Sequence, residues 1–145
     1  MPFSTAGFTL LELLLVVAMI SVVTMFSVTL GSGFIWRTDL SQAQYLTVIN
    51  LRHAQILARA QVDDSDWGVH IENNQLTVFK GNDFDTRDTE SDEEYDLGSV
   101  TVGTEVDVIY HKFSGEPYDS ILEIDLTTNN ETASITVNSE GTVIY

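Results

Sequence analysis

The pattern of apolar and polar positions divides the chain into an apolar N-terminal part and an alternating C-terminal part. Phe8–Leu30 is almost entirely apolar and carries one charged side chain, Glu12. As a helix this run would be about 35 Å long, enough to cross the roughly 30 Å hydrocarbon core of a bilayer. A secretory signal peptide usually has a shorter apolar core, of about 7–15 residues, behind a basic segment. The pattern therefore predicts a retained transmembrane anchor.

From Trp36 to Ala60 the apolar positions follow one stripe of a helix, and polar side chains occupy most of the remaining surface. Gly31 and Gly33 weaken the helical pattern by about 1 kcal/mol each relative to alanine. Either a local bend or an uninterrupted helix is compatible with them. We expect one helix from Phe8 to Gln61, with a transmembrane first half and an amphipathic second half.

After Asp66 the chain changes to short segments rich in β-branched residues, several of which alternate between apolar and polar positions. The predicted strands are 67–71, 75–80, 99–102, 106–113, 121–126, 133–138 and 142–145. Turn-forming residues separate these segments, and Gly141 stands where a hairpin loop commonly needs a left-handed residue. The predicted fold class is α+β, with the long N-terminal helix packed on an antiparallel β head.

Charge is concentrated in this head. Residues 61–145 carry twenty acidic and three basic side chains, in a chain whose formal net charge is −16. A surface of this sign repels phosphate backbones, so we do not expect the head to bind nucleic acid. Eight of the acids lie within residues 81–96, which we predict to be a mobile surface loop because few apolar side chains are present to order it.

The acidic loop 81–96 contains candidate calcium ligands. They are Asp83, Asp85, Asp88, Glu90 and Asp92. An EF-hand counted from Asp83 would need a ligand at its fifth position and glycine at its sixth, where this chain has Arg87 and Asp88. An irregular calcium loop and a solvated run of charge are both left open. We expect no assigned metal site and no cofactor, with calcium binding by this loop as the alternative.

The sequence offers no recognisable catalytic group. The chain contains no cysteine, which excludes thiol catalysis and disulfide bonds. The three histidines, His53, His70 and His111, have no partners at ligand spacing in the sequence. No phosphate-binding loop, dinucleotide fingerprint or nucleophile elbow occurs. We therefore do not expect an enzyme.

The stretch GFTLLE, Gly7 to Glu12, and the apolar run that follows it resemble the processing motif of type IV prepilins. In that family a membrane peptidase cleaves after the glycine and methylates the new N-terminal residue, and a glutamate stands at the fifth mature position. The resemblance implies cleavage between Gly7 and Phe8, N-methylation of Phe8, and an assembly role for Glu12, whose carboxylate would pair with the Phe8 amine. The leader, MPFSTAG, departs from the family pattern because it has no lysine or arginine.

The layout of the head is similar to the minor pseudopilin H class and related minor pilins. This resemblance implies a pilin-like chain with a leader (1–7), a transmembrane and filament-core helix half (8–36), an amphipathic helix half (37–62) and a β head (63–145). It implies a structural subunit of a type IV pilus or type II secretion pseudopilus. The implied partners are other pilin or pseudopilin subunits, the prepilin peptidase, an assembly platform with its ATPase, and the membrane.

The resemblance also implies a location. The chain would be a single-pass protein of the bacterial inner membrane, with its head outside the cytoplasm, before it enters an extracytoplasmic filament. The residues by themselves leave another function open, a membrane-tethered binding module whose acidic head captures calcium or a secreted partner.

Overall fold

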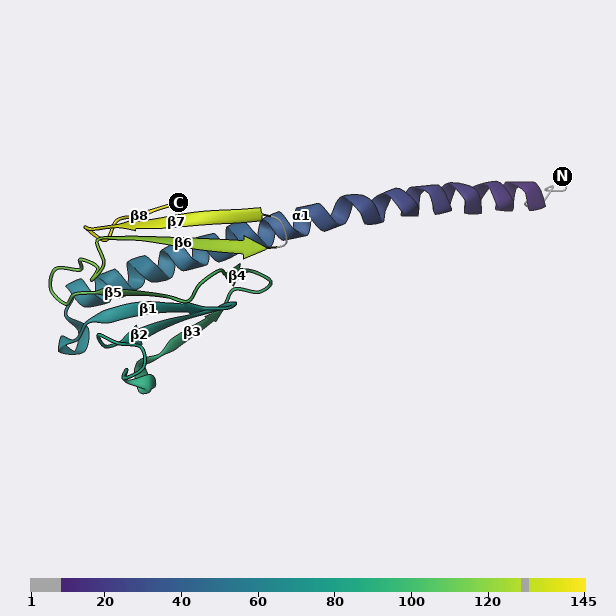
Figure 1. Cartoon of the computed structure of the whole chain (residues 1–145). Coiled ribbons are helices and arrows are strands. Elements are labelled where there is room, and N and C mark those ends of the chain that lie inside the picture. The colour runs from purple at the N-terminus through teal and green to yellow at the C-terminus, as the bar shows by residue number, and fades with distance from the viewer. Residues whose placement is uncertain (1–8, 129–130) are drawn as a thin grey trace, which may run out of the picture. The chain divides into compact units, whose positions relative to one another are not determined.

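The computed structural model describes residues 9–128 and 131–145, and within them the side chains of all residues except 26–38. The chain divides into two compact units, of which the first ends at Ile35 and the second is Trp36–Tyr145. Helix α1 belongs to both units, and the strands belong to the second (Figure 1).

Helix α1 runs from Leu10 to Arg59, a length of 50 residues, and continues through Gly31 and Gly33. Its bounds differ by two residues at each end from the predicted helix, Phe8 to Gln61. The chain leaves the helix at Gln61, which has a left-handed φ of 54°, a common conformation just after the end of a helix. A short 3-10 turn, η1 (Val62–Asp64), leads into the first strand.

The predicted fold class, a pilin-like chain whose helix crosses a membrane with its first half, 8–36, is wrong. Among the residues that the structure describes, no helix is both long and apolar enough to span a membrane.

Within 9–128 and 131–145, the strands form two antiparallel four-stranded sheets. The first sheet has the order β3-β2-β1-β5, and the second has the order β4-β6-β7-β8. The bounds are β1 Trp67–Glu72, β2 Gln75–Lys80, β3 Glu93–Asp96, β4 Thr101–Val102, β5 Val106–Tyr110, β6 Ile121–Thr128, β7 Glu131–Asn138 and β8 Val143–Ile144. A second 3-10 turn, η2 (Thr89–Ser91), precedes β3.

Each predicted strand is present, although 99–102 and 142–145 are reduced to two residues each. Gly141 has a φ of +77° in the turn between β7 and β8, as the sequence indicated. Strand β3 was not expected, because it lies inside the predicted acidic loop 81–96. It pairs with β2 through its backbone, with Glu93 opposite Val78 and Tyr95 opposite Leu76. The prediction of a loop is therefore wrong for residues 93–96.

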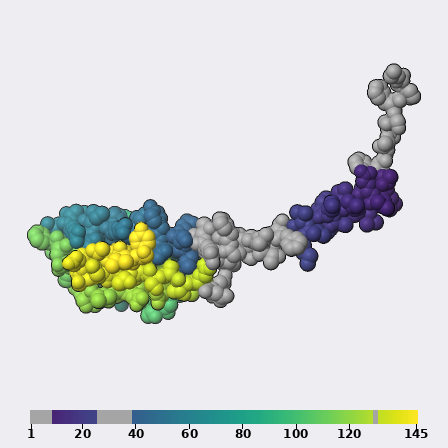
Figure 2. Space-filling view, turned by 90° about the horizontal axis from the view of Figure 1, so that it is seen from above, coloured from purple at the N-terminus to yellow at the C-terminus, as the bar shows by residue number. Residues whose placement is uncertain are grey.

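The hydrophobic core joins one face of the helix to both sheets. From α1 it includes Leu51, Ala54 and Ala58, and the sheets contribute side chains at alternating positions. Those fully buried are Val69, Ile71, Leu76, Val78, Val108, Tyr110, Ile124, Leu126, Ile135 and Val137. Figure 2 shows the C-terminal strands, in yellow, directly beside the helix. Every residue of this core lies between Leu40 and Val143, so the second unit contains a complete core of its own.

Candidate functional site

The start of α1 places part of the prepilin-like motif in a defined geometry. Gly7 and Phe8, the predicted cleavage and methylation site, lie outside the described residues. Thr9 precedes the helix, and its hydroxyl Oγ1 accepts a hydrogen bond of 3.2 Å from the backbone N–H of Glu12. The Thr9 carbonyl accepts from the N–H of Leu13 at 3.2 Å. Thr9 is therefore the N-cap residue of α1.

Glu12 stands at the third position of the helix, so that Thr9 and Glu12 have the threonine-x-x-glutamate spacing of a capping box. A carboxylate there is also favoured by the positive end of the helix dipole, by about 0.3–1 kcal/mol. This local role in starting the helix was missed by the sequence reasoning. The predicted pairing of Glu12 with the Phe8 amine stays a prediction.

The first turns of α1 expose their apolar side chains. Every side chain from Thr9 to Met25 is exposed, and the exposed fraction reaches 81% for Leu10 and 79% for Met25. Monomeric soluble proteins rarely leave contiguous apolar patches of more than a few hundred Å² uncovered. This part of the helix therefore has the surface of an element that is covered by another molecule.

The acidic loop, residues 81–92, is folded against the outer face of the first sheet by one aromatic side chain. The ring of Phe84 stacks on the imidazole of His70, with 3.5 Å between the ring centroids, and meets the ring of Phe79 edge-on at 5.3 Å. The guanidinium of Arg87 lies over the other side of Phe84, 3.6 Å from the ring centroid. The predicted loop therefore has an anchor that its composition did not indicate.

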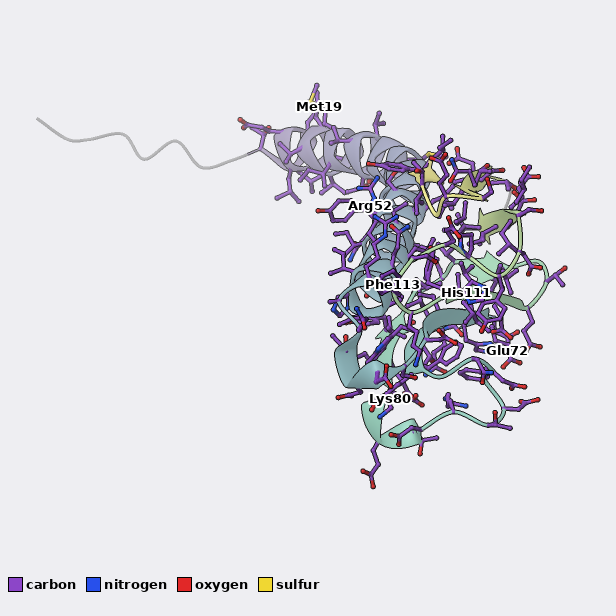
Figure 3. The ribbon with its side chains drawn as sticks, turned by 90° about the vertical axis from the view of Figure 1, so that its left-hand side faces the viewer. Met19, Arg52, Glu72, Lys80, His111 and Phe113 are labelled. Carbon is purple, nitrogen blue, oxygen red and sulfur yellow. The ribbon has the colours of Figure 1, made fainter. Side chains whose placement is uncertain are left out.

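Ion pairs hold the remainder of this loop. Arg87 Nε donates to Asp92 Oδ2 at 2.8 Å, and Lys80 Nζ lies 2.7 Å from Asp88 Oδ2 (Lys80 is labelled in Figure 3). The hydrogen bond between Lys80 and Asp88 lowers the pKa of the Asp88 carboxyl and raises the pKa of the Lys80 ammonium. Both groups are therefore charged across the neutral pH range, and the pair persists there.

The five candidate calcium ligands do not converge on one point. Asp83 Oδ1 accepts from the N–H of Asp85 at 2.8 Å, and Asp88 Oδ1 accepts from the N–H of Glu90 at 3.3 Å, so these carboxylates make local turns. Asp88 and Asp92 are paired with basic side chains, as described above. Within the described part of the chain, no group of three or more histidine or acidic side chains is arranged to hold a metal ion. Calcium binding remains untested.

His70 occupies a buried position that the sequence reasoning did not single out. It lies on the outer face of the first sheet directly opposite Asp107, and its Nδ1 is 2.7 Å from Asp107 Oδ1. The other ring nitrogen, Nε2, is buried and has no hydrogen-bond partner among the described residues, with Glu72 Oε2 at 3.8 Å. The alternation of β1 alone could have placed His70 on the face opposite Val69 and Ile71. Its contact with Phe84 required the tertiary structure.

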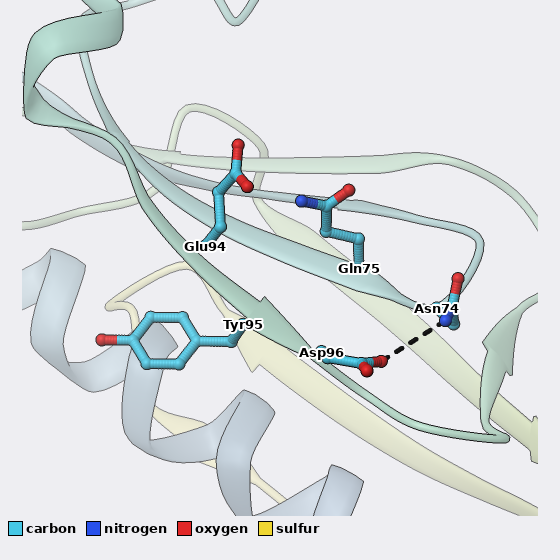
Figure 4. A pocket seen from close by; sticks show the side chains of 5 residues that line it. All are labelled: Asn74, Gln75, Glu94, Tyr95 and Asp96. Atoms are coloured by element: carbon cyan, nitrogen blue, oxygen red, sulfur yellow. Dashed lines mark hydrogen bonds between the residues drawn. The ribbon is translucent and has the colours of Figure 1, made fainter.

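A small acidic hollow lies at the edge strand β3. It has a volume of about 340 Å³ and is lined by Asn74, Gln75, Glu94, Tyr95 and Asp96 (Figure 4). The amide of Asn74 donates to Asp96 Oδ1 at 3.4 Å, which ties the β1–β2 turn to β3. We refer to this hollow as the acidic pocket.

Searches against models of known protein families, against curated proteins and against solved structures each find no match for this chain.

Proposed function

We propose that this chain is a structural subunit of a filament of the type IV pilus or type II secretion pseudopilus kind, cleaved between Gly7 and Phe8. The observation that carries the proposal is the difference in exposure between the two halves of α1. The helix begins at Leu10, within the prepilin-like motif Gly7–Glu12, and leaves the apolar side chains up to Met25 exposed. Its second half buries one face in the core of the β domain.

An exposed apolar helix surface favours association with similar surfaces. Full burial of one leucine side chain contributes about 1.5–3 kcal/mol, and several leucines are exposed in the first turns of α1. In the proposed filament these side chains pack against the equivalent helices of neighbouring subunits. Each β domain already covers one face of the second half of its own helix, so it need not rearrange on assembly.

Glu12 has two roles in this proposal. Its backbone and position support the start of α1 through Thr9. Its carboxylate pairs with the α-amino group that cleavage creates on Phe8, which is largely cationic at neutral pH because its pKa is near 8. The pair joins either positions i and i+4 of one helix or two adjacent subunits. The partners of such a subunit are the prepilin peptidase, an assembly platform with its ATPase, and sibling subunits.

Mass spectrometry of the N-terminus tests the processing step. Full chain isolated from cells that contain a prepilin peptidase should begin at an N-methylated Phe8, and Gly7→Leu should retain the leader because a side chain obstructs a peptidase that grips the backbone closely. An intact Met1 terminus in assembled material would contradict the proposal.

Three variants separate the roles of Glu12. Glu12→Ala and Glu12→Gln should still be cleaved but should enter filaments poorly, because both remove the charge. Glutamine suits the third helix position of a capping box as well as glutamate does, so Glu12→Gln isolates the loss of charge. Thr9→Ala removes the hydroxyl cap and keeps the carboxylate, and it should assemble. Normal assembly of Glu12→Gln would show that the carboxylate charge is not the assembly determinant.

A further inference from the structure

The second half of α1 exposes an apolar stripe on the side away from the core. Tyr45 and Ile56 are 61% and 62% exposed, and Ile49 is 41% exposed. With Arg52, these residues are spaced at i, i+4, i+7 and i+11, which places them along one line of a helix. Strand β8 extends the same surface, because the Arg52 guanidinium lies 5.7 Å from the ring centroid of Tyr145. We call Tyr45, Ile49, Arg52, Ile56 and Tyr145 the helix stripe.

The helix stripe has a charge opposite to that of the remainder of the domain. Residues 40–60 contain no aspartate or glutamate, whereas the whole chain has a formal net charge of −16. Lys80, Arg87 and Lys112 each have a carboxylate within 4 Å. Among the ion pairs of the described residues, Arg52 has none. Arg59 has none either, but its guanidinium donates to the carbonyl oxygens of Ser114 and Glu140. Among the described side chains of this domain, Arg52 is therefore the lysine or arginine left available to a carboxylate of another molecule.

A groove runs between the helix stripe and β8. Its volume is about 290 Å³, and it is lined by Arg52, Gln55, Ile56, Gly141, Thr142 and Val143. Its floor is rigid, since the Gln55 amide donates to the carbonyl oxygens of Gly115 at 2.9 Å and Glu140 at 3.2 Å. Tyrosine and arginine, which stand beside this groove, are among the side chains that protein interfaces favour at their centres.

The acidic pocket has the complementary character. It presents the carboxylates of Glu94 and Asp96, whereas the half-buried ring of Tyr95 points to the other face of β3 and packs against the core (Figure 4). The backbone of β3 pairs with β2 on one side, and its other side is the edge of the sheet. The pocket therefore offers a guanidinium two carboxylates in a site about 340 Å³ in volume.

The two surfaces lie on opposite flanks of the helix. On one flank Arg52 contacts Tyr145, next to β8, and on the other His53 Nδ1 lies 3.9 Å from Glu93 Oε2 of β3. Figure 1 shows β8 and β3 on the two sides of α1 within this domain. One molecule cannot join its own stripe to its own pocket. Two copies side by side can, and each then keeps one free stripe and one free pocket.

We infer that the helix stripe of one copy docks against the acidic pocket of a second copy, with Arg52 between the carboxylates of Glu94 and Asp96. The occupant is a second copy because the chain itself carries, in its acidic pocket, the negative charge that complements Arg52. Such a head-to-tail contact is heterologous, so it extends into a ring or an open helical array instead of closing as a twofold dimer. It goes beyond the proposed function, which concerns the first half of α1.

Disulfide trapping tests this contact in the full chain, which has no cysteine of its own. Ile49→Cys places a thiol in the stripe, and Gln75→Cys places one at the pocket, while Arg52 and Glu94 remain in place. Mixed and oxidised, the two variants should form a 49–75 crosslinked dimer. Ile49→Cys mixed with Glu123→Cys, on the exposed outer face of β6, is the matched control and should crosslink only at the background rate.

Charge reversal shows whether the attraction between Arg52 and the carboxylate of Glu94 directs the contact. Arg52→Glu in the Ile49→Cys chain, or Glu94→Arg in the Gln75→Cys chain, should each lower the crosslink yield about tenfold or more, because juxtaposed like charges repel. The two reversals together should restore the yield, and salt should weaken the original contact.

Three results would each overturn the proposed contact. The first is a 49–75 crosslink yield equal to that of the Glu123→Cys control, and the second is a yield that neither charge reversal changes. The third is a preferred 49–49 dimer, which indicates a twofold helix-to-helix contact. Crosslinking is independent of cleavage after Gly7, so an uncleaved N-terminus would contradict the proposed function without affecting this result.

Discussion

The phenol of Tyr110 offers a direct measurement of how a buried polar group affects this fold. Tyr110 lies on β5 and is fully buried, and its hydroxyl has no hydrogen-bond partner among the described residues. Burying an uncompensated hydroxyl costs about 1–3 kcal/mol in mutational series. Phenylalanine keeps the ring and removes the cost, so we expect Tyr110→Phe to raise the free energy of unfolding by about 1 kcal/mol. For a domain of this size that corresponds to a Tm increase of roughly 4–8 °C.

The same burial makes the stability difference between Tyr110→Phe and the unsubstituted chain depend on pH. Burial raises the pKa of the Tyr110 phenol far above its ordinary value of 10.0. Above pH 10 the unfolded chain therefore releases this proton while the folded chain retains it. Folding stability then falls with pH, by at most about 1.4 kcal/mol per pH unit from this group. Tyr110→Phe removes this contribution. The free energy of unfolding of the variant should therefore exceed that of the unsubstituted chain by a constant amount between pH 6 and 9, and by a growing amount above pH 10.

Guanidinium unfolding of residues 36–145, followed by tryptophan fluorescence at several pH values, measures both effects. Tyr118→Phe is the matched control, because the Tyr118 hydroxyl donates to Asp66 Oδ2 at 3.0 Å. Loss of this hydrogen bond in Tyr118→Phe should lower the free energy of unfolding by about 0.5–1.5 kcal/mol. A folded Tyr110→Phe variant that is less stable than the unsubstituted domain at pH 7 would refute the reasoning, since it would mean that the hydroxyl makes a stabilising bond.

Three further predictions follow from the domain. Residues 36–145 alone should give the circular dichroism of a folded α+β protein and a cooperative thermal transition, because the whole core lies within them; a disordered-chain spectrum would contradict this. Phe84→Ala should lower the free energy of unfolding by about 1–2 kcal/mol, less than a fully buried phenylalanine, and should accelerate amide exchange in residues 81–92 but not in β6 and β7. Millimolar calcium should raise the Tm if the acidic loop binds it, and an unchanged Tm would exclude a calcium loop.

Much of the secondary structure could be predicted from the sequence because it depends on neighbours along the chain. Helix α1 follows from an uninterrupted run of helix-compatible residues, and its N-terminus lies at the threonine of a capping box. The hairpin of β1 and β2 follows from two apolar segments around Asn73 and Asn74, and the β7–β8 turn follows from Gly141. The apolar N-terminal run was also evident, although its interpretation as a membrane span was wrong.

The tertiary structure alone decided which strands share a sheet and what lies against their outer faces. Strand β3 has no apolar alternation, and it exists because β2 offers an unpaired backbone edge. The stack that anchors the acidic loop joins His70, Phe84 and Arg87, and the partner of His70 is Asp107 on β5. Register across strands brings these residues together, and register depends on the packing of the whole core, which no local pattern encodes.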